Sequence, residues 1–69
     1  MKKVTHTNIL CWAISHLNSE ARTAIDRHEK AEEMGATEIA DMLQREIDDF
    51  AATIETLKMM YEIETGKRF

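Results

Sequence analysis

The chain has 69 residues, of which 43% are apolar and 32% are charged, and its formal net charge is −4. This composition excludes a disordered tail and a membrane-spanning protein, and the length allows one domain near the lower limit for a self-sufficient core. There is no proline, and the only two glycines are Gly35 and Gly66. Since these two residue types mark most turns, the chain has room for very few turns. We therefore predict an all-α fold in a single domain, residues 1–69.

The charge and the cysteine content of the chain indicate its cellular location and the class of its partners. The excess of acidic residues favours solubility and argues against nucleic acid as a partner. The single cysteine, Cys11, cannot form an internal disulfide, so nothing points to secretion. The apolar run 9–17 is too short to span a bilayer, and polar residues separate it from the N-terminal lysines, which does not fit a signal peptide. We expect a cytoplasmic protein with no membrane partner.

The first predicted element is a helix over about residues 8–34. Residues at alternating steps of four and three lie along one side of it, and we call this line the seam: Leu10, Ile14, Leu17, Ala21, Ala24, His28 and Ala31. His28 is its one strongly polar member, and we expect its ring to bond a nearby carboxylate such as Glu32. Asn18 and Ser19 also fit the end of one helix and the cap of another. Because the seam passes through them without a shift, we predict one continuous helix, with a three-helix monomer broken near Asn18–Ser19 as the alternative.

A turn over residues 33–37 leads to a second helix over about residues 37–65. Gly35 suits the left-handed position that ends a helix, and Thr37 suits the N-cap of the next helix. The second helix carries its own half of the seam, at steps of three and four: Ala40, Leu43, Ile47, Phe50, Ile54, Leu57 and Tyr61.

Folding the chain at this turn brings the two halves of the seam into register as a long antiparallel hairpin. Each seam residue then has an opposite number: Ala31 with Ala40, His28 with Leu43, Ala24 with Ile47, Ala21 with Phe50, Leu17 with Ile54, Ile14 with Leu57, and Leu10 with Tyr61. Near the middle, small residues on the first helix face large ones on the second, as interdigitating side chains require.

At the open end of the hairpin, a second set of apolar residues lies off the seam. Its members are Ile9, Trp12, Ala13, Ala52, Met59, Met60 and Ile63. A two-helix hairpin cannot cover both sets, because each helix already uses one face on its neighbour. We therefore predict a homo-oligomer, a dimer or larger, that forms a four-helix or larger bundle. A surface kept for a different protein is the alternative. Near the turn we expect an ordinary charged, solvated face.

One group of side chains on the first helix suggests contacts for a small anionic ligand such as a nucleotide: Arg22, Arg27, Lys30 and His28. Neighbouring acids also suit pairing along the helix, such as Asp26 with Lys30.

Other chemistry finds little support in the sequence. His6, Cys11 and His16 are spaced by five residues, which spreads them around a helix, so we expect no metal site. There is no phosphate-binding loop or nucleophile motif, so we expect neither an enzyme nor a bound cofactor.

In size and plan alone, the chain is similar to Rop, a plasmid RNA-binding hairpin that dimerises into a four-helix bundle. It also has the proportions of small helical proteins by which phages sequester nucleotide signals or block defence enzymes. No motif is shared with either group, so both are analogies of architecture. We expect a small regulatory protein that acts through non-enzymatic interactions. The alternative is a phage-type protein that binds a nucleotide signal or inhibits a host protein.

Overall fold

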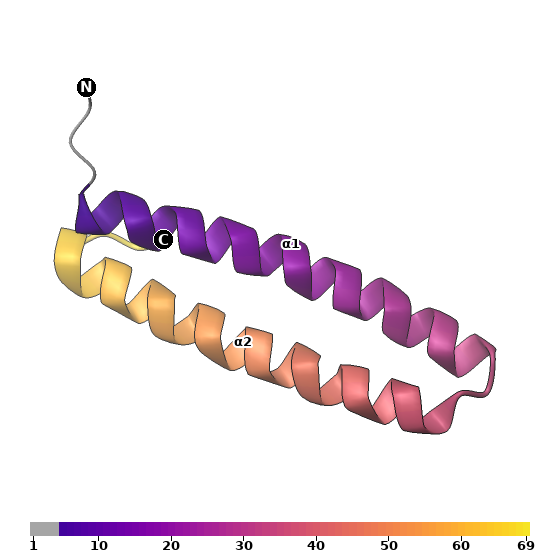
Figure 1. The fold of residues 1–69 in the computed structure, drawn as a ribbon. Coiled ribbons are helices and arrows are strands. Elements are labelled where there is room, and N and C mark those ends of the chain that lie inside the picture. The colour runs from indigo at the N-terminus through magenta and orange to yellow at the C-terminus, as the bar shows by residue number, and fades with distance from the viewer. Residues whose placement is uncertain (1–4) are drawn as a thin grey trace.

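The computed structural model describes residues 5–69 and contains two α-helices, α1 (His6–Glu33) and α2 (Thr37–Thr65). The helices run antiparallel and side by side, so the first turn of α1 lies beside the last turn of α2 (Figure 1). Residues 5–69 contain no β-strand. The predicted all-α hairpin is confirmed, with helix ends that differ from the expected ones by two residues at most.

α1 begins earlier than predicted because Thr5 caps it. The Thr5 Oγ1 accepts a hydrogen bond from the Asn8 backbone N–H at 3.1 Å, and the Thr5 carbonyl accepts one from the Ile9 N–H. The helix then runs without interruption through Asn18 and Ser19. The alternative of a three-helix chain broken at these residues is therefore wrong. The seam residues on both sides of them hold one continuous helix against α2.

A tight turn joins the helices. Gly35 has a φ of 72°, the left-handed conformation predicted for it. Its N–H donates to the Glu32 carbonyl at 3.1 Å and the Ala36 N–H donates to the Ala31 carbonyl at 2.8 Å, which together form a Schellman motif. The predicted cap at Thr37 is wrong: Ala36 holds the N-cap position without a side-chain bond, and Thr37 is the first residue of α2. The Thr37 N–H donates instead to the Gly35 carbonyl at 3.0 Å, across an inverse γ-turn centred on Ala36.

The predicted seam is the core of the hairpin. All buried residues of the described chain belong to it: Leu10, Ile14, Ala24, Ala31, Ala40, Leu43 and Ile54. The remaining seam residues are half-buried. Next to the turn, Ala31 packs with Ala40 and Leu43, as the predicted register requires. Among residues 5–69, only Ile14 is completely inaccessible, with 0% of its surface exposed, so the core is very thin.

Polar and aromatic contacts close the open end. His6 Nδ1 lies 2.9 Å from Glu64 Oε1 and so links the first turn of α1 to the last turn of α2. Gly66, with a φ of 69°, ends α2. The chain then turns back, and Phe69 packs edge-on against Tyr61 with the ring centroids 5.1 Å apart. Both ends of the seam are therefore held, one by the turn and the other by these contacts.

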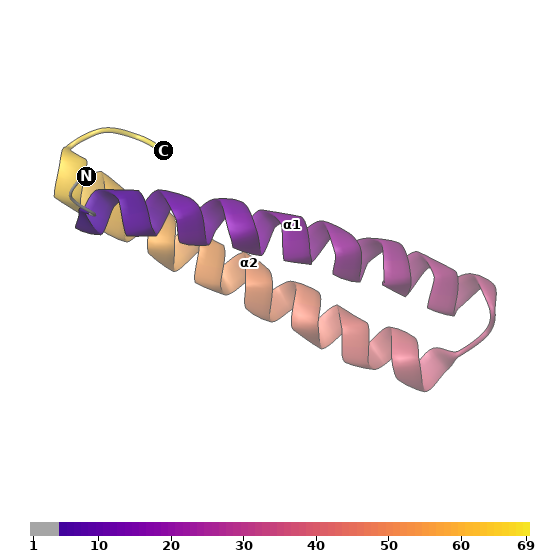
Figure 2. The same cartoon turned by 45° about the horizontal axis from the view of Figure 1, so that its top comes forward.

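The hairpin is a single layer of helices. Its shortest principal extent is 14 Å, little more than the diameter of one α-helix. A second view shows the helices crossing at a shallow angle without a further element on either side (Figure 2). Globular domains normally enclose a core between two layers, so both broad faces of this layer stay open. Within residues 5–69, neither helix has a stretch long and apolar enough to cross a membrane.

Candidate interaction surface

Exposed apolar side chains gather on one side of the hairpin. Of the ten exposed large apolar residues in the described chain, six lie one position before a seam residue or before its continuation at residues 35 and 64: Ile9, Met34, Ile39, Met42, Met60 and Ile63. In an antiparallel pair, such positions on both helices project to the same side, which we call the leading flank. Positions one after a seam residue form the opposite, trailing flank. Only Ile25 among the ten lies there.

At the turn, the leading flank forms an apolar groove of about 300 Å³. It is lined by side chains from both helices and the turn: Arg27, Lys30, Ala31, Met34, Ala36, Ile39, Met42 and Leu43. Met34, Ile39 and Met42 are 81%, 54% and 60% exposed. The expectation of an ordinary charged face near the turn is therefore wrong on this flank. Each of these three residues follows an acidic residue in the sequence, and only the reversal of the chain brings them together on one surface.

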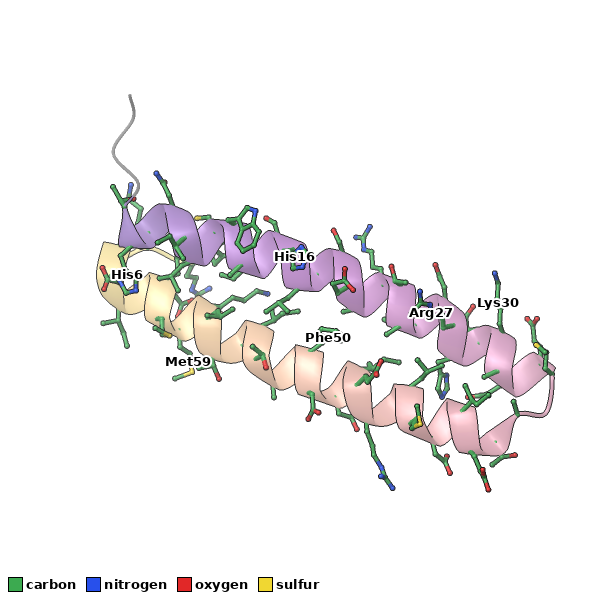
Figure 3. All side chains as sticks on the ribbon, in the orientation of Figure 1. His6, His16, Arg27, Lys30, Phe50 and Met59 are labelled. Carbon is green, nitrogen blue, oxygen red and sulfur yellow. The ribbon has the colours of Figure 1, made fainter. Side chains whose placement is uncertain are left out.

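The apolar set predicted at the open end is exposed or half-exposed, and it divides between two sides of the hairpin. Four members lie on the leading flank: Ile9, Ala13, Met60 and Ile63. Three lie two positions from the seam residues on either side, about 200° round the helix, and so face outward: Trp12, Ala52 and Met59. Figure 3 shows Met59 pointing away from α1. Trp12 is 68% exposed and stacks on His16 with the ring centroids 5.3 Å apart.

Between its two apolar ends, the leading flank is polar. An open groove there is lined by Leu17, Glu20, Glu46, Asp49, Phe50 and Thr53. Phe50 projects from α2 toward α1 (Figure 3). Three threonines on this flank donate their hydroxyl protons to the carbonyl four residues earlier, at 3.2, 2.8 and 3.0 Å: Thr23, Thr53 and Thr56. Their hydroxyl protons are thus already used within the helices.

The four predicted anion contacts do not form one cluster. Arg27 and Lys30 line the groove at the turn, on the leading flank. Arg22 is five residues from Arg27, which places it about 140° round the helix. Within residues 5–69, no Arg or Lys nitrogen lies within 4.0 Å of a carboxylate oxygen, so the predicted Asp26–Lys30 pair does not form.

His28 belongs to the other side. It lines a separate groove with Glu32, Thr37 and Asp41. Its Nε2 lies 3.1 Å from Glu32 Oε1, the carboxylate expected from the sequence, and its side chain is 20% exposed. This geometry is that of a histidine at the edge of a core, one turn from its carboxylate partner.

The remaining histidines and the cysteine are held apart. His6 bonds to Glu64, His16 stacks on Trp12, and Cys11 is half-buried on the trailing flank. Among the residues that the structure describes, no three His, Cys, Asp or Glu side chains come together as ligands for a metal ion.

Comparison of the chain with protein-family models, with curated proteins and with solved structures found no match. A proposal for its function starts from two features of the hairpin: a flank with apolar ends and a charged middle, and two cations beside an apolar groove.

Proposed function

We propose that the chain is a small, non-enzymatic interaction protein that works in the cytoplasm as a homo-oligomer of helical hairpins, a dimer or larger, joined into a helical bundle. The observation that carries this proposal is the concentration of six exposed large apolar side chains on the leading flank. Apolar surface of this extent on one side of a single layer costs free energy in water, and a second layer covers it.

The exposed area supports the same proposal. The chain exposes 5678 Å², whereas a compact protein of 8.0 kDa exposes about 4,500 Å². The excess is about 1,200 Å², more than the roughly 800 Å² that each partner buries in an interface of standard size. The radius of gyration, 15.3 Å, also exceeds the roughly 11 Å expected of a compact domain of this length. A second copy supplies the layer that a single hairpin lacks.

Sedimentation equilibrium over a series of concentrations tests the proposal. We expect a mass at least double 8.0 kDa, with dissociation and loss of helical circular dichroism on dilution. Ile63→Glu, at a side chain 82% exposed in the hairpin, should dissociate the assembly by placing a charge in an apolar interface. Ile25→Glu, the matched change on the trailing flank, should leave the mass unchanged. A wild-type monomer of undiminished helicity at every concentration would contradict the proposal.

We propose, as a second candidate, that Arg27 and Lys30 bind a small anionic ligand such as a nucleotide. Both side chains line the apolar groove at the turn, where the cations suit a phosphate and the methionines suit a base. Thermal unfolding with a panel of nucleotides tests this candidate, because a ligand at about one hundred times its Kd adds about 2.7 kcal/mol to the free energy of unfolding. The added stability should vanish in Arg27→Ala and persist in Arg22→Ala. A panel without any shift would contradict it.

A further inference from the structure

We propose that the second copy binds to the leading flank with its turn at the same end, the two hairpins being related by a two-fold axis parallel to their length. This arrangement rests on the homo-oligomer proposed above and adds the surface and the orientation. α1 of each copy then lies antiparallel along α2 of the other. The occupant of the flank is therefore a second copy of this chain.

In this orientation the flank is complementary to itself. Rotation about an axis parallel to the helices does not change the position of a residue along that axis. Residues at one level of the first hairpin therefore face residues at the same level of the second. Helical rise places Ile9 level with Ile63 at the open end, and Met34 level with Ile39 beside the turn. Apolar side chains therefore meet apolar ones at both ends. Between them, the cation of Arg27 meets the carboxylate of Glu46 from the second copy.

The opposite orientation, with the turns at opposite ends, is less complementary. It moves Arg27 away from Glu46 and places it over the open half of the second copy, near Ala13. It also places Glu20, near the middle of α1, over Glu20 of the second copy. Arg27 would then lose its carboxylate partner and two carboxylates would face each other, and both changes cost free energy. The charge pattern favours turns at one end.

The area of the leading flank and the hydrogen bonding of its central threonines are compatible with such an interface. The hairpin is 48 Å long and two helices wide, which offers on the order of 800 Å² per copy, the amount buried in a standard interface. The threonines in the middle already donate their hydroxyl protons within their own helices. Their hydroxyl groups can therefore be buried in the interface without leaving a hydrogen-bond donor unpaired.

Mixing two charge variants tests the arrangement. The Arg27→Glu chain carries acidic side chains at both positions 27 and 46, and the Glu46→Arg chain carries cationic side chains at both. Each homodimer therefore opposes like charges, whereas the mixed dimer opposes unlike charges at both contacts. We expect native mass spectrometry of the mixture to show at least about nine-tenths heterodimer, against about half for random pairing. An ion pair between residues 27 and 46 of the same chain cannot give this result, because both positions carry the same sign of charge in each variant chain.

The matched control uses the trailing flank. Arg22 and Asp48 lie there at similar heights, so Arg22→Glu mixed with Asp48→Arg should pair at random. Random pairing of the Arg27→Glu and Glu46→Arg chains from a dimeric wild type would overturn this arrangement and leave the homo-oligomer standing. A wild type that is monomeric at every concentration would overturn both.

The distance between the two turns of a dimer tests the arrangement without the charge variants, so the test holds even where those variants do not fold. A spin label on Glu38→Cys, in a Cys11→Ser chain, marks the start of α2. Two labels of a dimer should lie within about 30 Å of each other when the turns share one end, and beyond about 40 Å when they do not, because the helices rise about 1.5 Å per residue. The longer distance would overturn the arrangement.

Discussion

Ile14 offers the sharpest test of how the hairpin is held together. It is the one side chain of the described residues with 0% of its surface exposed. Ile14→Ala removes three carbon atoms, each worth about 0.8 kcal/mol of burial, and leaves a cavity whose cost adds to that sum. We expect the free energy of unfolding to fall by about 2.5 to 4 kcal/mol. A chain of this length has about 3 to 10 kcal/mol in total, so the variant should lie near the limit of folding.

Urea unfolding followed by circular dichroism measures this loss, at the lowest protein concentration that gives a signal. Ile63→Ala is the matched control, since it removes the same atoms from a side chain that is 82% exposed. It should cost less than about 0.5 kcal/mol when the hairpin is a monomer. A loss at Ile14 no larger than the loss at Ile63 would refute the identification of the seam as the core.

Three further changes test separate parts of the hairpin by the same unfolding assay. Thr5→Ala should cost about 1 kcal/mol, because the cap of α1 loses its Oγ1 acceptor, and Thr5→Ser should restore most of it. Gly35→Ala should cost about 1 to 2 kcal/mol from the left-handed backbone alone, since no atom lies within 4 Å of an added Cβ; Gly35→Asn should cost less. Ala21→Leu and Phe50→Leu should each destabilise, and the double variant should recover at least about 0.5 kcal/mol relative to their sum. Strictly additive losses at that pair would mean that the two side chains do not touch.

The seam and the turn could be predicted from the sequence because each has a local signal. The seam repeats at alternating steps of three and four through both helices, and a run of that length specifies both the buried face and the register. Gly35 marks the reversal because a left-handed residue ends the first helix. The predicted start of α1 is two residues late, because its cap, Thr5, lies among other polar residues that fit the N-cap position as well.

The leading flank at the turn could not be predicted in the same way. Met34 belongs to the end of one helix, whereas Ile39 and Met42 belong to the start of the next, and none of them repeats along its own helix as an apolar line. The two helices must be placed side by side before these residues form one surface. The distribution of the predicted anion contacts also depends on the fold: Arg22, Arg27 and His28 are close along the chain, but within one hairpin helical rotation places Arg22 and His28 on a different side from Arg27.

The backbone of residues 34–36 decides whether the two halves of the seam can meet. If these residues took ordinary helical angles, residues 6–65 would form one straight rod of about 60 residues, roughly 90 Å long. In such a rod the two halves of the seam would face opposite sides, because Ala31 and Ala40 are nine residues apart, about 180° round a continuous helix. No single partner helix could then cover both halves. The left-handed angle of Gly35 and the hydrogen bonds of one short turn bring Ala31 and Ala40 together instead.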